Sequence, residues 1–580
     1  MSYLLVCTPE EKYVKYKEKC VPYFSTLHET ESELQIFCGE LHKVEKKLTN
    51  EKWELNNNKL LIDESFSIIK ICKNKNKIYF ATSKSGLEPI LYYYKNNTFL
   101  LSDNFWEIVN FLEPKEEDID KDAVIENLNL PYPLFYNTFI KDVNYLPPGY
   151  FGEFAIINNE LKLKKYFNFK YSPKVSIDMQ VATENVDKIL NELMKDIKEE
   201  CGDVQYAVGL SGGLDSRVIP YYAQKNGLNI QSFIFGAKRP HSLFLSRDHK
   251  NARELSKIFC IKHSEIEWNK KTLQKRIDLE LKNFPLGVPQ FFKFEFYDDY
   301  DVLLTGGSGM IIGGHSIPEN IESITSNELV YHMWGLARTF YPNSLFNQRV
   351  QRAFKYLFNK DIKIESNEEW FELICNKEIY SKINQKFVQY IEKRKKANKS
   401  NLDIFEEYFN NILGARNRYG GFESGLGTKR SFSIYVPRML HETLCWRADL
   451  LQGRPVLKNL ILKYIPSTAD IKAQNYEGAL NKKDNIVFKI INMLIFIIRG
   501  NGTAMEQKYF KYCKNDFKTT MLNSCKWFNN ILDLRNHIND IADFDNYRLI
   551  LTLWKTKMVI DIIENKKYIA FIDKQRKINF

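Results

Sequence analysis

The 580-residue chain has few of the features that mark secreted, metal-stapled or membrane proteins. Its ten cysteines include no Cys-x-x-Cys pair, which argues against a zinc ribbon and against a disulfide framework. The start of the chain has neither a basic flank nor a long apolar core, so it does not look like a signal peptide. The most apolar later run, residues 486–498, contains Lys489 and Asn492 and is too short to span a bilayer. We therefore expect a cytoplasmic protein without a membrane span.

No block of like charge dominates the sequence. The formal net charge of +11 is modest for this length, and the lysines are spread along the chain. Short basic clusters such as residues 393–396 are typical of solvated helix faces, and no basic stripe accompanies the aromatic residues. We expect no nucleic-acid partner. The composition, 44% hydrophobic and 27% charged, is that of a globular protein, and the length indicates two or three domains.

The hydrophobic pattern changes character near residue 175. Before it, short alternating apolar runs predict strands over residues 77–82, 89–95, 98–101 and 150–157. After it, helix and strand alternate, with helices predicted over 181–200, 216–226 and 247–259 and strands over 206–210, 231–235, 263–268 and 302–304. This alternation predicts a parallel sheet covered by helices. Beyond residue 320 the pattern is mainly helical.

The most informative motif joins the predicted strand 206–210 to the helix that follows it. Residues 211–216 read Ser-Gly-Gly-Leu-Asp-Ser. Gly212 and Gly213 lack a Cβ atom, so backbone N–H groups there can close on an anion, and the following helix N-terminus favours negative charge. Asp215 would repel a phosphate unless Mg²⁺ lay between them. No Gly-Lys-Ser/Thr follows, so this is not a Walker A loop; the alternative is a turn that binds nothing.

The loop resembles the pyrophosphate loop of the ATP pyrophosphatase superfamily, and further motifs resemble the glutamine-dependent asparagine synthetases and their β-lactam synthetase relatives. These motifs occur in the family's order at residues 86–93, 100–103, 146–150, 246–248, 436–437, 456–461 and 465–466. The resemblance implies an α/β and α+β multidomain protein. It would have an Ntn-hydrolase-like, β-rich sandwich (1–170), an adenine-nucleotide α-hydrolase-like (PP-loop) parallel-sheet domain (178–475) and a helical C-terminal extension (476–580).

The N-terminal half departs from the family at its catalytic position. The family's glutaminase uses a cysteine at position 2, whereas this chain has Ser2 and also lacks the Asn-Gly-Glu motif that binds glutamine. Cys7 is the nearest thiol, and we interpret it as a small buried residue. The resemblance therefore implies a domain that keeps the fold but has lost glutamine hydrolysis, as in the β-lactam synthetases.

A second departure lies in the turn after the predicted strand 302–304. The family form, Ser-Gly-Glu-Gly-x-Asp-Glu, carries a Mg²⁺ ligand and a glutamate that controls proton transfer. Residues 305–310 here read Thr-Gly-Gly-Ser-Gly-Met, so Gly307 replaces that glutamate and Met310 replaces the aspartate. A thioether is a poor ligand for a hard cation, which leaves Asp215 as the one predicted metal ligand.

The resemblance also assigns roles to single residues. Asp215 would hold Mg²⁺, and Lys458 would stabilise charge on the adenylate as it collapses; an exposed helix lysine is the alternative. Arg217 is either a contact to phosphate or substrate carboxylate, or a structural or solvent-facing residue, and His315 is more simply a structural histidine than a general base. The residues expected to line the ATP site are Leu210, Ser211, Gly212, Gly213, Asp215, Ser216, Gly236 and Gly306.

The implied activity is an AMP- and pyrophosphate-forming ligase with ATP and Mg²⁺ as cofactors. It would adenylate a small-molecule or peptide carboxylate for attack by ammonia or an amine. One alternative is a catalytically impaired nucleotide-binding relative, a sensor or partner subunit, which Gly307 and Met310 favour. Another is a tRNA- or sulfur-modifying ATP pyrophosphatase, which the lack of catalytic cysteine pairs disfavours. The oligomeric state is left undecided, with a homodimer as one possibility.

Overall fold

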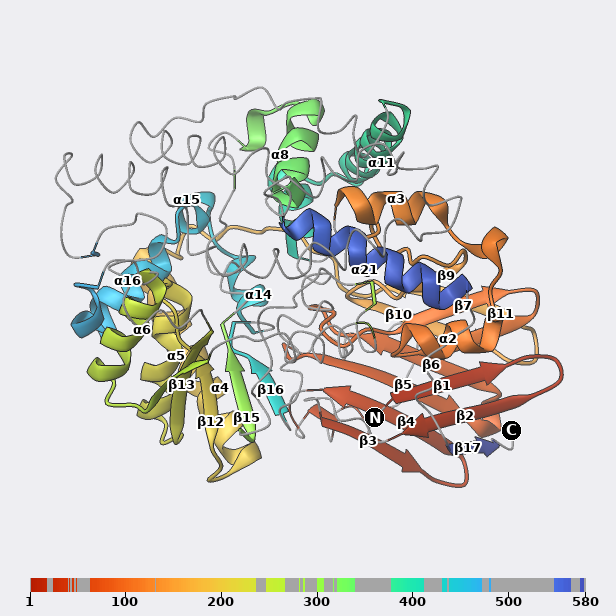
Figure 1. Ribbon diagram of the computed structural model, residues 1–580, viewed down its shortest axis with the longest axis horizontal. Helices are drawn as coiled ribbons and strands as arrows, with labels where there is room; N and C mark the ends of the chain where they lie inside the picture. Colours follow the sequence, from red (N-terminus) through yellow and green to blue (C-terminus); the bar gives the residue numbers. More distant parts are fainter. Residues whose placement is uncertain are drawn as a thin grey trace.

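The computed structural model has a β-rich half and a half built on a parallel sheet, with further helices beside both (Figure 1). The described residues are 2–17, 24–39, 41, 44–45, 48, 63–130, 132–235, 247–266, 281, 285–286, 300–306, 317, 321–338, 377–410, 430–435, 438–471, 479–480, 547–564 and 574–577.

The N-terminal half is a sandwich of two six-stranded antiparallel sheets. The first sheet has the order β17-β2-β1-β8-β7-β9, and the second has the order β11-β10-β6-β5-β4-β3. The strands of the first sheet are β1 (Ser2–Cys7), β2 (Lys12–Lys17), β7 (Leu91–Lys95), β8 (Thr98–Ser102), β9 (Val143–Tyr145) and β17 (Lys574–Lys577). Those of the second are β3 (Phe24–Glu29), β4 (Glu33–Gly39), β5 (Phe66–Cys72), β6 (Lys77–Thr82), β10 (Tyr150–Ala155) and β11 (Glu160–Lys165).

The two sheets enclose one apolar core. Alternate side chains along each strand point inward, as a period-two pattern requires: Leu5 of β1, Ile71 of β5 and Phe99 of β8 all belong to this buried cluster. Cys7 is part of it too, and burial raises the pKa of its thiol to about 12. The interpretation of Cys7 as a buried packing residue is confirmed, because a thiol with that pKa stays protonated near neutral pH.

The second half is built on a five-stranded parallel sheet in the order β14-β13-β12-β15-β16. Its strands are β12 (Tyr206–Gly209), β13 (Ile230–Phe235), β14 (His263–Ile266), β15 (Val302–Thr305) and β16 (Arg430–Ser433), and its first helices are α4 (Met179–Cys201), α5 (Leu214–Lys225) and α6 (Arg247–Ile258). The predicted fold class is confirmed by this topology. Sequence patterning missed β16, which lies in the stretch expected to be mainly helical.

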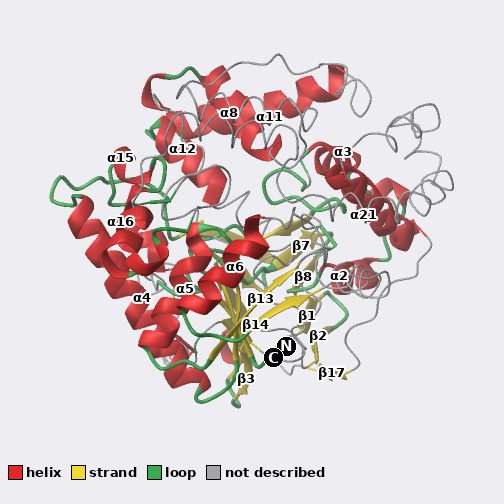
Figure 2. Ribbon diagram, turned by 60° about the vertical axis from the view of Figure 1, so that its left-hand side comes forward, coloured by secondary structure: helices red, strands yellow, loops and turns green. Residues whose placement is uncertain are grey.

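Further helices stand beside the two halves (Figure 2). They are α2 (Phe105–Leu112), α3 (Lys121–Asn129), α8 (Ser326–Arg338), α11 (Lys377–Lys396), α12 (Asn401–Glu407), α14 (Arg438–Thr443), α15 (Ala448–Leu451), α16 (Pro455–Tyr464) and α21 (Tyr547–Glu564). Within segment 476–580, α21 lies beside α3, where Asn127 Nδ2 donates to Thr556 Oγ1 at 2.7 Å. The last described strand, β17, joins the edge of the sandwich at β2.

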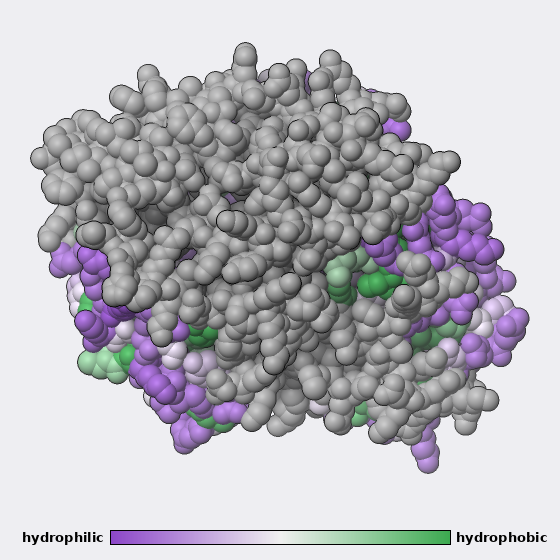
Figure 3. Space-filling model, viewed as in Figure 1, coloured by the Kyte–Doolittle hydropathy of each residue, from purple (hydrophilic) through white to green (hydrophobic). Residues whose placement is uncertain are grey.

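The described surface offers no broad apolar face. The exposed large hydrophobic side chains, such as Ile157, Val175 and Leu462, come from separate elements. In the view of Figure 3 the described atoms at the rim are mostly hydrophilic. None of the helices that the structure describes is long and apolar enough to cross a membrane.

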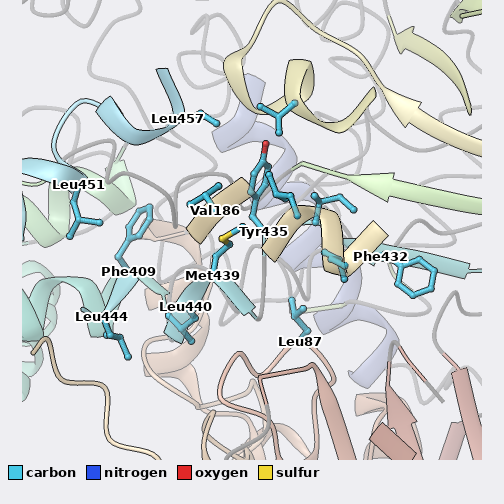
Figure 4. Packing of buried hydrophobic residues seen from close by; sticks show 14 of the residues in the cluster. Leu87, Val186, Phe409, Phe432, Tyr435, Met439, Leu440, Leu444, Leu451 and Leu457 are labelled. Carbon is cyan, nitrogen blue, oxygen red and sulfur yellow. The ribbon is translucent and has the colours of Figure 1, made fainter. Parts of the chain in front are cut away.

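A continuous buried cluster connects the sandwich to the parallel-sheet half. Leu87, which follows β6, shares this cluster with Val186 of α4 and with Tyr435 and Met439, which follow β16 (Figure 4). Ion pairs reinforce the junction: Arg438 Nε donates to Glu64 Oε1 at 2.8 Å, and the same guanidinium pairs with Asp196 of α4. Because the two halves bury apolar side chains against each other, we expect them to move little relative to one another.

A buried carboxyl group in α12 makes stability depend on pH. Burial raises the pKa of Glu406 to about 7, although hydrogen bonds from Asn410 and Tyr171 favour its charged form. The folded protein then holds a proton that an unfolded chain releases near pH 4.5. Stability from this group is present at low pH and falls as pH rises towards 7, by at most about 3 kcal/mol. Glu406→Gln is expected to flatten that fall.

The measurement is the midpoint of thermal unfolding of wild type and Glu406→Gln between pH 5 and pH 8. The variant should gain stability relative to wild type as pH rises. The neighbouring Glu407→Gln is the matched control, since Glu407 pairs with Lys165 and Lys399 and should lose stability instead. Identical pH profiles for wild type and Glu406→Gln would contradict the expectation.

Candidate nucleotide site

Two glycine-containing turns meet at the carboxyl ends of the two middle strands. β12 ends at Gly209 and leads through the 210–213 loop into α5, and β15 ends at Thr305, directly before Gly306. These strands are neighbours at the point where the strand order reverses, which is where open α/β sheets bind ligands. A Cβ atom on Gly306 would come within 3.0 Å of Ile219 Cδ1. Gly306 therefore lies against the first turns of α5.

Two serine hydroxyls fix the curvature of the loop. Ser216 Oγ accepts a hydrogen bond from Ser211 N at 3.1 Å and lies 3.0 Å from the carbonyl oxygen of Ser211. Ser211 Oγ in turn accepts from Gly213 N at 3.2 Å. The N-cap of α5 is Gly213, which has no side chain to cap the helix. Backbone N–H groups at such a helix start suit an anion, so the loop has the shape expected of a phosphate cradle.

Arg217 connects the loop to a later part of the chain through hydrogen bonds to main-chain oxygens. Its side chain is fully buried, with Nη2 donating to the carbonyl oxygen of Gly212 and Nη1 donating to that of Thr468, each at 3.0 Å. Thr468 ends η9 (Pro466–Thr468), the turn that follows α16. Of the two interpretations of Arg217, the structure favours the structural one: the guanidinium connects the loop to the end of α16.

Asp215, the predicted magnesium ligand, faces a basic residue. Arg454 Nη1 donates to Asp215 Oδ2 at 2.9 Å, and the Tyr435 hydroxyl donates to the main-chain oxygen of Asp215 at 2.7 Å. Sequence reasoning missed Arg454. No local motif marks this residue, and only the fold brings it to Asp215, which lies 239 residues earlier in the sequence.

Of the other residues singled out in the sequence, some lie within the described part of the structure and some lie outside it. Lys458 lies on α16 one turn beyond Arg454, and its main-chain N donates to the oxygen of Arg454 at 3.1 Å; its role on the adenylate stays a prediction. Leu210 is buried at the end of β12. The remaining positions, Gly236, Gly307, Met310 and His315, lie outside the described residues.

The donor set suits a metal ion that arrives with a nucleotide. Among the described residues, no group of three or more His, Cys, Asp and Glu side chains could hold a metal ion. Mg²⁺ in nucleotide sites is bound by one or two carboxylates together with phosphate oxygens and waters. Asp215 alone fits that requirement better than it fits a permanently bound ion.

The structure defines an α/β fold with a parallel sheet and a glycine-containing loop after its central strand, at the edge where open sheets of this kind bind ligands. No protein-family model and no curated protein matches the chain. Local likeness is found to an NH3-dependent NAD synthetase from Campylobacter jejuni (17% identity, TM-score 0.14) and to an NMN synthetase from Francisella tularensis (18% identity, TM-score 0.13). Each match covers 18% of this chain, and they cover 41% and 48% of the two synthetase chains, less than half of each.

Another likeness covers a larger share of the chain. A glutamine phosphoribosylpyrophosphate amidotransferase from B. subtilis matches 46% of this chain and 84% of its own length, with 9% identity and a TM-score of 0.18. All these TM-scores are far below 0.5.

Proposed function

We propose that this chain is an ATP-dependent ligase that forms carbon–nitrogen bonds and releases AMP and pyrophosphate. The observation that carries the proposal is the Ser-Gly-Gly-Leu-Asp-Ser motif at the carboxyl end of the central strand, whose last three residues form the N-terminus of α5. Backbone N–H groups, a helix start and a carboxylate are gathered within six residues, 211–216. That combination suits the pyrophosphate of a magnesium-bound nucleotide.

In the proposed reaction a carboxylate oxygen of the substrate attacks the α-phosphorus of ATP. The bond to the bridging oxygen breaks, and pyrophosphate leaves into the cradle formed by Ser211, Gly212, Gly213 and Ser216. Bound Mg²⁺, held by Asp215, supplies neutralisation of the phosphate charge. Ammonia or an amine then attacks the acyl carbon, loses a proton and expels AMP. A fixed cation near the adenylate lowers the barrier to this second step, and Lys458 is the residue proposed for it.

The nitrogen is proposed to come from free ammonia or from an amine on a substrate. In the sandwich, position 2 is a serine, and the nearest thiol, that of Cys7, is buried between the sheets with its pKa raised to about 12. A protonated, enclosed thiol is a poor nucleophile. The finer proposal is therefore an asparagine synthetase-like ligase that has no glutaminase activity of its own. Its substrate would be a small-molecule or peptide carboxylate. It would work in the cytoplasm, as a homodimer or in another assembly.

A second candidate is a nucleotide-binding relative that does not catalyse the reaction. The contact between Arg454 and Asp215 favours it, because the carboxylate that would hold Mg²⁺ already faces a cation at 2.9 Å. Such a protein would bind nucleotide without turning it over.

Release of pyrophosphate and AMP from Mg·ATP separates the two candidates. The purified protein would be assayed alone, with aspartate plus ammonia or glutamine, and with a small-molecule extract of the source cells. Release that requires the extract would support a ligase with a dedicated carboxylate, and glutamine-dependent release would contradict the loss of glutaminase activity. Nucleotide binding by calorimetry without release under any condition would favour the non-catalytic candidate. RNA that co-purifies would favour the tRNA-modifying alternative.

A further inference from the structure

The carboxylate of Asp215 is held by the guanidinium of Arg454, the residue directly before α16. Arg454 Nη1 lies 2.9 Å from Asp215 Oδ2, and the two side chains are 15% and 23% exposed. Charges that are this far removed from water interact more strongly than a surface ion pair does. The ion pair with Arg454 thus balances the charge of Asp215, at the position where the proposed nucleotide would bring its metal.

The backbone that presents Arg454 is unusual. Gly453 and Arg454 have φ values of +72° and +60°, two successive left-handed residues, and Pro455 then begins α16. Glycine adopts this conformation freely, whereas for arginine it costs about 1–2 kcal/mol. A residue such as asparagine would fit the same backbone with less strain. The contact with Asp215 offsets that cost, so the conformation of the turn and the ion pair support each other.

We propose that Arg454 is a built-in cation that competes with nucleotide-bound Mg²⁺ for the Asp215 carboxylate. This inference rests on the proposed nucleotide site. Without metal, Arg454 neutralises Asp215, so that the carboxylate does not repel the phosphates. When the nucleotide arrives with Mg²⁺, the metal takes the carboxylate and the guanidinium turns to the phosphates. The dependence of nucleotide binding on Mg²⁺ is therefore set by Arg454.

The test is calorimetric binding of α,β-methylene ATP, whose α–β linkage is not cleaved, in Mg²⁺ and in EDTA. The quantity of interest is the ratio of the Kd in EDTA to the Kd in Mg²⁺. Arg454→Asn keeps a residue that tolerates the left-handed turn but removes the guanidinium. It should raise that ratio roughly tenfold, since metal-free nucleotide then meets an uncompensated carboxylate. Asp215→Asn should bring the ratio close to one.

Arg454→Lys is the second variant. It keeps the positive charge as a more strongly hydrated ammonium, and its ratio should lie between those of wild type and Arg454→Asn, which keeps the inference testable if Arg454→Asn does not fold. A ratio that is the same in wild type, Arg454→Asn and Arg454→Lys would overturn the inference, because a purely structural arginine or a simple phosphate contact changes both Kd values alike. No nucleotide binding by folded wild type, with or without Mg²⁺, would instead overturn the proposed function and the inference with it.

Discussion

Replacing Asp215 by asparagine is expected to slow pyrophosphate release by about a thousandfold, which is about 4 kcal/mol of transition-state stabilisation. Asparagine has nearly the same size as aspartate, and the hydrogen bond from Tyr435 goes to the main-chain oxygen of Asp215, so the loop should keep its shape. What is lost is the negative charge that holds Mg²⁺. The measurement is the steady-state rate of pyrophosphate release with the substrate that activates the wild-type protein.

The matched control for this variant is Asp203→Asn. It makes the same chemical change just before β12, at the opposite end of the strand from the loop, where Asp203 is exposed and pairs with Lys198. Its rate should equal that of wild type. Wild-type turnover in Asp215→Asn would show that the carboxylate takes no part in the reaction.

Replacing Arg217 by methionine is expected to lower the free energy of unfolding by about 4 kcal/mol. Methionine fills much of the same space, but it leaves the carbonyl oxygens of Gly212 and Thr468 without the donors that Arg217 supplies. Buried acceptors that lose their donors cost about 1–3 kcal/mol each. The measurement is the shift of the urea unfolding midpoint, compared with that of Arg217→Lys.

The lysine variant separates two roles of Arg217. A single ammonium cannot match the planar fork that spans both carbonyl oxygens, so Arg217→Lys should recover only part of the stability. Nucleotide affinity should fall in step with stability in both variants, since the same contact shapes the loop. A stable Arg217→Met protein that nevertheless loses all turnover would contradict this account and would place Arg217 on the substrate.

The sequence predicted the sheet best where a strand is short, apolar and bounded by glycine. β12, β13 and β15 satisfy that description, and their positions agree with those expected. β16 does not, because alternate positions are occupied by Ser431 and Ser433, and these residues become a strand only by pairing in register with β15. Local patterning cannot report a pairing between segments that lie so far apart in the chain.

The same reason explains which parts of the candidate site were found. The Ser-Gly-Gly-Leu-Asp-Ser loop is a local motif, and each of its contacts between Ser211 and Ser216 lies within the loop itself. The partners of Asp215 and Arg217 come from the N-cap of α16 and from η9, more than two hundred residues further on. Tertiary packing decides which basic residue meets Asp215, and sequence reasoning singled out Lys458 where the fold brings Arg454.

The pairing of β17 with β2 has a consequence for the order in which the protein can fold. β2 leaves the ribosome more than five hundred residues before β17, and its outer edge is covered only once residues 574–577 have been synthesised. At about 5–20 residues per second, that interval is roughly half a minute to two minutes. An uncovered strand edge pairs readily with other chains. Nascent copies on one messenger are therefore exposed to edge-to-edge association throughout translation, and chaperone protection of the N-terminal sandwich would matter most during that interval.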